Sequence, residues 1–337
     1  MRVKKDLLHT PEGVRDIYET ECDRKIALEE KLLSTLRSYG YHAIETPTFE
    51  YFDIFGKEIG TTPSRELYKF FDREGNTLVL RPDVTPQIAR AAAKYYMEED
   101  TPLRFCYKGN TFINNSSLQG RLKEVTQIGA ELISDDSVEA DAEIVAMAVD
   151  CIRKAGQRDF QLRIGHAGYF SGLIEAAGLS PETAADLREL IENKNFFGVE
   201  ELIDPLPIAE ELKELFCAIG RPFGSAEELS SLAAAAAHCP KAQPAIQRLT
   251  QLEKALERYE VREYISYELG MIGGYEYYTG IVFAGFSYGS GEPIVKGGRY
   301  DRLLSYFGKN APAIGFAFVT DQLLSAITRQ KEVPKEK

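Results

Sequence analysis

The order of strand-like and helix-like segments constrains the fold of this chain more than any other feature of its sequence. Segments typical of strands dominate the first 170 residues and return after residue 264, whereas residues 171–260 have long helical periodicities. Strands interrupted by helices favour an antiparallel sheet flanked by helices, which is an α+β fold with a helical insertion. We therefore expect a core of residues 1–170 and 264–325, a helical insertion over 171–263 and a polar C-terminal tail over 326–337.

Local patterns predict the elements of this core. The expected helices cover 24–39, 85–97 and 136–156, and the expected strands cover 41–50, 66–72, 77–81, 103–112 and 125–133. Asp136 followed by Glu139 predicts a capping box at the start of the third helix. The segment 296–304 is typical of a tight turn that leads into a helix, whose N-terminus could face an anion.

Composition excludes several classes of protein. The formal net charge of −12 disfavours a nucleic-acid partner held mainly by phosphate contacts. No apolar run reaches the roughly 18 residues of a membrane span, and the first residues lack the apolar region of a signal peptide. The five cysteines and four histidines are scattered without metal-ligand spacing, so we expect free thiols and no metal. No P-loop or nucleophile-elbow motif is present, and we expect a cytoplasmic protein without a cofactor.

Polar residues on the expected strands could form a binding site. Gln127 and Glu131 are four residues apart, so both would face one side of a strand. The candidates are Asp83, Thr85, Gln127, Glu131, Tyr275, Tyr277 and Tyr278, with Tyr278 expected on the face opposite to the other two tyrosines. If their segments are neighbours, these carboxylates, amide and phenols would suit a cationic or amphoteric small ligand. The alternative is a solvated strand face with tyrosines packed at its rim.

Four arginines could hold an anion. They are Arg81, Arg90, Arg121 and Arg299. Because no glycine-rich phosphate loop accompanies them, each is also explained as an ordinary ion-pair partner. Arg121 and Arg299 remain the candidates for anion binding.

Seven segments in order along the chain resemble the core of class II histidyl-tRNA synthetases. They are 9–19, 39–50, 78–91, 107–132, 273–283, 296–304 and 311–324. The resemblance implies a six-stranded antiparallel sheet, dimerisation through the first motif around Pro47, and a histidine pocket. It also implies that Asp83, Thr85 and Gln127 hold the ammonium of histidine, and that Glu131 and Tyr278 hold the imidazole, with Tyr277 beside them. Asp83 stands where the synthetases have glutamate.

Departures from the synthetase pattern argue against amino-acid activation. Ile113, Gly273 and Gln322 stand where the synthetases carry arginines that bind the activated carboxyl group and ATP, and Asn115 replaces an acidic ATP ligand. Each lost oxyanion donor typically costs about 10²–10³ in rate. We therefore expect no catalytic residue and no enzymatic activity. The sequence ends just after the third motif, so we also expect no anticodon-binding domain.

A synthetase-like core of this kind resembles the family of regulatory subunits of ATP phosphoribosyltransferase, and the segment LRPDVTPQ (80–87) is typical of that family. The resemblance implies a partner, the short-form catalytic subunit in the first step of histidine biosynthesis. It also implies activation of that partner, feedback inhibition by histidine, and a homodimer within a hetero-octamer. Histidine would bind either in the synthetase-like pocket or at the interface with the partner. The alternatives are a tRNA-sensing module and a diverged histidine-activating enzyme, although we do not expect tRNA binding.

Overall fold

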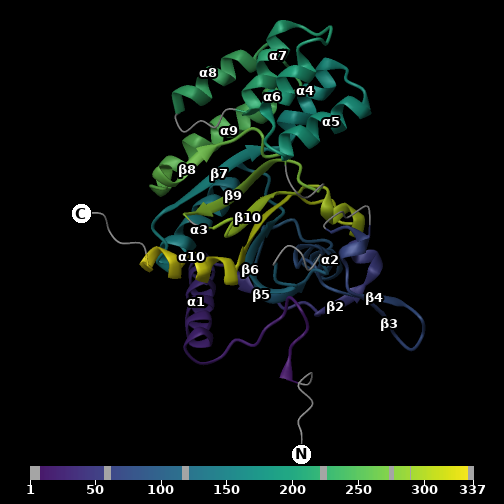
Figure 1. Cartoon of the computed structure of the whole chain (residues 1–337), viewed down its shortest axis with the longest axis vertical. Coiled ribbons are helices and arrows are strands. Elements are labelled where there is room, and N and C mark those ends of the chain that lie inside the picture. The colour runs from purple at the N-terminus through teal and green to yellow at the C-terminus, as the bar shows by residue number, and fades with distance from the viewer. Residues whose placement is uncertain are drawn as a thin grey trace, which may run out of the picture.

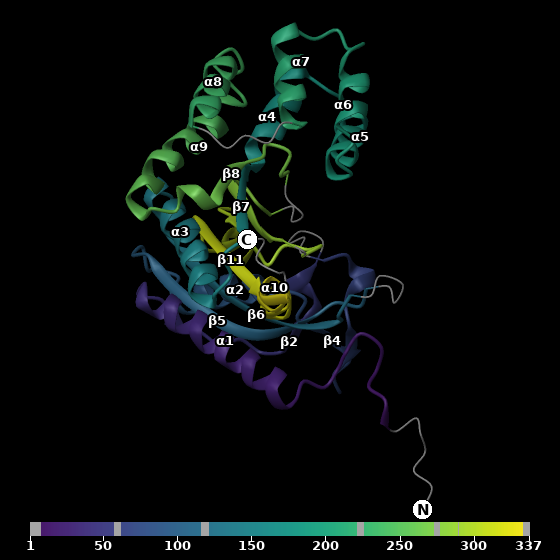
Figure 2. The same cartoon turned by 60° about the vertical axis from the view of Figure 1, so that its left-hand side comes forward.

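The chain forms a large sheet with helices on both faces, and a group of helices extends from one end of it (Figures 1 and 2). The computed structural model describes residues 8–56, 62–115, 121–220, 226–272, 277–288 and 290–332. None of the helices within these ranges is long and apolar enough to cross a membrane.

The central sheet has eight strands in the order β1-β5-β6-β11-β10-β9-β7-β8. Their bounds are β1 His42–Ala43, β5 Leu103–Phe112, β6 Glu124–Ile133, β7 Phe160–His166, β8 Ile265–Tyr267, β9 Ile281–Ser287, β10 Val295–Arg299 and β11 Ala313–Val319. All pairs among the inner six strands are antiparallel, whereas β1 and β8 pair in parallel at the edges. The six strands implied by the family resemblance are therefore wrong in number, because the sheet also contains the short edge strands β1 and β8, of two and three residues.

A second, three-stranded antiparallel sheet has the order β2-β4-β3. Its strands are β2 Phe49–Tyr51, β3 Lys69–Phe71 and β4 Thr77–Leu80. The expected single strand over 41–50 is thus divided between two sheets, with Pro47 in the break. Proline lacks the N–H that a central strand needs, which fits this interruption.

The helices cover both faces of the central sheet. Their bounds are α1 Glu19–Ser38, α2 Thr85–Tyr95, α3 Val138–Ala155, α4 Ala167–Ala177, α5 Pro181–Glu192, α6 Phe196–Ile203, α7 Glu210–Cys217, α8 Ala226–Ala236, α9 Gln243–Leu256 and α10 Thr320–Glu332. The helices α1 and α3 pack in the main apolar core on one face, and α2 packs in a second apolar cluster on the other face. We call this second face the α2 face.

Two local expectations differ from the structure, and a third is met by a short helix. The cap of α3 is Ser137 rather than Asp136, because the Ser137 hydroxyl accepts the Ala140 N–H at 3.1 Å. The helix expected after β10 is a five-residue 3₁₀ helix, Leu303–Phe307. The expected polar tail begins inside α10, which continues to Glu332.

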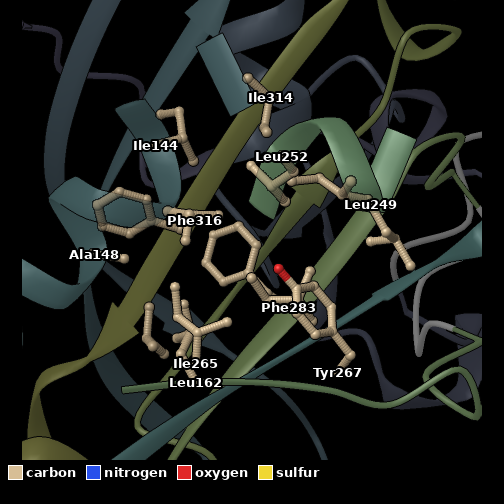
Figure 3. Packing of buried hydrophobic residues seen from close by; sticks show 14 of the residues in the cluster. Ile144, Ala148, Leu162, Leu249, Leu252, Ile265, Tyr267, Phe283, Ile314 and Phe316 are labelled. Carbon is tan, nitrogen blue, oxygen red and sulfur yellow. The ribbon is translucent and has the colours of Figure 1, made fainter. Parts of the chain in front are cut away.

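The helices α4–α9 occupy the region of the expected insertion, and α4–α8 lie at the end of the molecule shown at the top of Figure 1. The helix α9 connects this group to the core, because it contacts α3, α4 and β7. Figure 3 shows Leu249 and Leu252 of α9 beside Phe283 of β9 and Phe316 of β11. The main apolar core therefore continues from the sheet into these helices. The insertion boundaries at 171 and 263 stay a prediction.

One buried carboxylate links three elements that are distant in sequence. Asp141 of α3 is fully buried and accepts hydrogen bonds from Arg248 Nε of α9 at 2.6 Å and Arg299 Nε of β10 at 2.8 Å. Arg248 also donates to the Ser137 carbonyl at 2.8 Å, and Arg299 donates to the Asp135 carbonyl at 3.0 Å. We call these contacts the Asp141 junction. It holds the start of α3 between the sheet and the connecting helix.

We expect Asp141→Asn to lower the free energy of unfolding by about 3 kcal/mol, because it leaves the buried Arg299 guanidinium with only the more exposed Asp301 as counter-charge. Urea unfolding at neutral pH would measure this change. The matched control is Asp150→Asn, which breaks the exposed pair with Lys154 on the same helix and should cost less than about 0.5 kcal/mol. Equal stability of the two variants would contradict a structural role of the junction.

Candidate functional site

A group of polar side chains converges on the α2 face of the central sheet. Gln127 and Glu131 lie on β6 and point to the same side, since strand residues alternate between faces. Thr85 at the start of α2 reaches this side, because its hydroxyl bonds to Glu131. We call the following set the polar cluster: Asp83, Thr85, Tyr107, Gln127, Glu131 and Tyr300.

Glu131 is the central residue of the polar cluster. Only 1% of its surface is exposed, and its carboxyl group accepts hydrogen bonds from the Thr85 hydroxyl at 2.7 Å and from the Tyr300 hydroxyl. Burial raises the pKa of Glu131 to about 8, because these two hydrogen bonds do not offset the loss of water. Gly315 on the neighbouring strand makes room for this carboxyl group, since a Cβ there would lie 1.7 Å from Glu131 Oε2.

Asp83 supplies a second buried carboxyl group, directly before α2. Its Oδ1 accepts the Val84 N–H at 2.7 Å, and burial raises the pKa of Asp83 to about 6. Within the described residues, no lysine or arginine forms an ion pair with Asp83 or Glu131. The polar cluster therefore holds two buried acidic groups without a basic partner, an arrangement that disfavours their charged forms.

Several polar atoms of the cluster lack a hydrogen bond within the part of the chain that the structure describes. By strict geometry they are Asp83 Oδ2, Tyr107 Oη and Gln127 Oε1, all of them buried, although Tyr277 and Thr85 lie close enough to lower the pKa of Asp83 and Tyr107 respectively. Buried polar groups are satisfied in most proteins, so several such atoms in one place indicate room for an additional partner. Two of the three can only accept a hydrogen bond, namely the carboxylate and amide oxygens.

Two further tyrosine rings, those of Tyr277 and Tyr278, border the polar cluster. Tyr277 lies 4.9 Å from Tyr278 and 5.6 Å from Tyr300, measured between ring centroids. The ring of Tyr278 covers Gly298 of β10, where a Cβ would lie 2.7 Å from it. The expectation that Tyr277 and Tyr278 face opposite sides is wrong, because this segment is a turn and strand alternation does not apply. Tyr275 and Gly273 lie outside the described residues.

The structure brings Asp83, Thr85 and Glu131 together as expected, and it adds two residues that sequence analysis missed. Tyr300 follows β10 and bonds to Glu131, and Tyr107 lies on β5 opposite Gly129, midway between Gln127 and Glu131. The pairing register of β5 with β6 selects Tyr107, and no local pattern reveals this register. Binding of a ligand by these residues stays a prediction.

The four arginines have other partners. Arg90 pairs with Glu50 at 2.9 Å, Arg121 pairs with Glu292, and Arg299 belongs to the Asp141 junction. The Arg81 guanidinium donates to the carbonyl oxygens of Asn110 and Thr46 at 2.7 and 2.8 Å. These contacts fit the ordinary ion-pair interpretation and compete with any anion, so anion binding by Arg121 or Arg299 stays a prediction.

Metal and disulfide chemistry gain no support. Among the residues that the structure describes, no group of three His, Cys, Asp or Glu side chains is arranged to hold a metal ion. The five cysteines are free.

The antiparallel inner sheet and the polar cluster beside the start of α2 are the features of a class II synthetase-like α+β protein. The family model of histidyl-tRNA synthetase matches residues 13–323. Similar proteins named ATP phosphoribosyltransferase regulatory subunit include one from Acetivibrio thermocellus, 41% identical over 96% of this chain and 77% of the relative. Another, from Caldanaerobacter subterraneus, is 37% identical over 97% of this chain and 84% of the relative. The chain therefore belongs to the histidyl-tRNA synthetase family and, within it, to the ATP phosphoribosyltransferase regulatory subunits.

Solved structures agree with this assignment. A Bacillus halodurans protein described as an ATP phosphoribosyltransferase regulatory subunit/histidyl-tRNA synthetase superposes with a TM-score of 0.87 at 32% identity, over 96% of this chain and 84% of that chain. The histidyl-tRNA synthetase from Nostoc has a TM-score of 0.80 at 18% identity, over 98% of this chain and 77% of that chain. The second likeness shows the shared fold alone.

The raised pKa of Glu131 predicts how stability depends on pH. The folded chain keeps the proton of Glu131 up to about pH 8, whereas an ordinary glutamate loses it near pH 4.5. Between these values the unfolded chain binds fewer protons, so the contribution of Glu131 to the free energy of unfolding falls as the pH rises. We expect Glu131→Gln to be more stable than the wild type at pH 8, by about 1–3 kcal/mol, and similar to it near pH 5.

Urea unfolding at pH 5, 6.5 and 8 would measure this difference. The control is Glu124→Gln on the same strand, where the carboxyl group bonds to Asn110 at an exposed site and the pH slope should stay as in the wild type. A Glu131→Gln variant that is less stable at pH 8 than at pH 5, relative to the wild type, would show that the native carboxylate is compensated.

Proposed function

We propose that this chain is a regulatory subunit that activates a short-form ATP phosphoribosyltransferase catalytic subunit in the cytoplasm and inhibits it in response to histidine. The name of its relatives, regulatory subunit, supports a non-catalytic role and a catalytic partner. Feedback by histidine is our extension, and the polar cluster supports it. In this proposal, homodimers of the chain assemble with the partner into a hetero-octamer.

The observation that supports histidine binding is the pair of buried carboxyl groups, which have no basic partner among the residues that the structure describes. A buried charge without a partner is costly, so burial raises the pKa of Glu131 to about 8 and that of Asp83 to about 6. A ligand with an ammonium group and an N–H donor on a ring would supply the missing positive charge and donors. Histidine has both groups.

The free acceptors support a division of roles within the polar cluster. Asp83 Oδ2 and Gln127 Oε1 would accept hydrogen bonds from the ammonium of histidine, beside the Thr85 hydroxyl. Glu131 would accept from the imidazole, next to the rings of Tyr277 and Tyr278. To act as a regulator, histidine must bind two assembly states unequally, with a coupling free energy of roughly 1–3 kcal/mol.

Mixing experiments test the regulatory role. We expect turnover of ATP and phosphoribosyl pyrophosphate by the catalytic subunit from the same organism to rise when this chain is added, and to fall again with histidine. Glu131→Gln should raise the histidine concentration for half-inhibition at least tenfold, because the amide cannot supply a negative charge. Glu124→Gln should match the wild type.

Two outcomes would contradict this proposal in different ways. If Glu131→Gln keeps the wild-type response to histidine, the effector binds elsewhere, for example at the interface between the subunits. If mixing changes nothing, the regulatory role fails, and salt-dependent tRNA binding and histidine-dependent ATP–pyrophosphate exchange should be measured instead.

The exposed face of the three-stranded sheet supports the homodimer. Phe49, Tyr51 and Phe70 lie on this face and are 51%, 54% and 37% exposed. Solvent-exposed aromatic groups of this size often mark a protein interface. The strand β2 that carries Phe49 follows Pro47, around which the family resemblance implies dimerisation. A second copy of this chain is the occupant we propose.

We expect Phe49→Asp to shift the chain from dimer to monomer, because it buries a charge in the proposed interface. Light scattering after size-exclusion chromatography would measure the mass. Phe71→Asp is the matched control, since Phe71 is 72% exposed and lies on the opposite face of the same sheet. A dimer that survives the first change, or that is lost equally in both variants, would contradict this interface.

A further inference from the structure

A lysine lies on the same face of the sheet as the polar cluster. The register pairs Gly298 with Gly315 and Gly315 with Glu131, so these three form one row across β10, β11 and β6. The next row on this face is Lys296, Ala317 and Gly129. With strands spaced about 4.8 Å apart and about 3.4 Å per residue, the Cα atoms of Lys296 and Glu131 lie roughly 12 Å apart.

The strand between these two residues presents little side-chain bulk. On this face β11 contributes Gly315 and Ala317. The space over Gly315 is taken by the carboxyl group of Glu131 itself, and the space over Gly298 by the ring of Tyr278. The long side chain of Lys296 can therefore extend over β11 toward the polar cluster without crossing a large residue from that strand.

The ammonium of Lys296 is unpaired. Within the described residues it forms no hydrogen bond and no ion pair, and the nearby Glu292 is already paired with Arg121. Lys296 keeps exposed surface, whereas the other four residues of β10 are buried. Burial lowers the pKa of Lys296, the nearby Arg121 adds to this lowering, and Glu292 opposes it. Within the described residues, Lys296 thus has no ion-pair partner, and by strand register it lies on the same sheet face as Glu131.

We propose that Lys296 binds the carboxylate of the amino acid whose ammonium lies at Asp83 and Gln127. A zwitterion has opposite charges at its two ends, so one ligand would neutralise both the carboxyl groups of the polar cluster and the ammonium of Lys296. Hydrogen bonds between ionised groups are about twice as strong as neutral ones. Lys296 would therefore select amino acids over amines that have the same side chain. This inference rests on histidine binding at the polar cluster, as proposed above.

Calorimetry with L-histidine and with histamine, which lacks the carboxylate, tests this inference on the full chain. We expect Lys296→Met to weaken histidine binding about tenfold and to leave histamine binding within twofold of the wild type. Lys296→Arg should keep most of the histidine affinity, because it keeps the charge. Lys94→Met on α2 is the matched control and should change neither affinity. Thermal melts of each variant check that it is folded.

Three results would overturn this inference. The first is an equal loss of histidine and histamine binding in Lys296→Met, which indicates a structural role. The second is unchanged histidine binding in that variant while Glu131→Gln abolishes binding, which leaves the proposed function intact. The third comes from titrating the same variants with inorganic phosphate. If Lys296→Met loses phosphate binding but keeps histidine binding, Lys296 belongs to a site for free oxyanions. A wild-type chain that binds neither histidine nor histamine would instead refute the proposed function.

Discussion

The Asp141 junction is the interaction on which the arrangement of this molecule depends. A fully buried carboxylate of α3 is neutralised by Arg248 from the helical group and by Arg299 from the sheet. The same arginines hold backbone carbonyls at the start of α3, so three elements are fixed together. Arg299 is followed directly by Tyr300, whose hydroxyl reaches Glu131 on the opposite face of the sheet. The junction therefore also positions one wall of the polar cluster.

The two faces of the sheet give their buried acids different partners. On one face, two arginines pair with Asp141, although burial still raises the pKa of this carboxyl group, and the result is a structural link. On the α2 face, Asp83 and Glu131 have no arginine or lysine partner among the described residues, and burial raises the pKa of both carboxyl groups. Buried carboxyl groups without a positive partner lower the free energy of unfolding, and a bound cationic ligand would raise it again. This contrast separates the structural acid from the candidate binding site.

Much of the fold could be predicted from the sequence because its signals are local. The strands β5 and β6 and the helix α2 fall within one or two residues of the expected ranges, since their apolar spacing is a strong pattern. The edge strand β1 falls inside the expected strand over 41–50, whereas β8 had no expected range because only three residues pair there. The face of Tyr278 was wrong because its segment is a turn rather than a strand.

The sequence by itself determined the order of the family motifs and, through the two-residue period of a strand, the common face of Gln127 and Glu131. Only the tertiary structure decided which residues join them. Tyr107, Tyr300 and Lys296 reach the same face through the pairing of β5, β6, β11 and β10. The pairing of β6 with β11 joins segments more than 160 residues apart in the chain, such as Glu131 with Gly315, and it brings the pair β5–β6 beside the pair β10–β11. Register between such distant strands is fixed by packing of the whole core, and no local pattern encodes it.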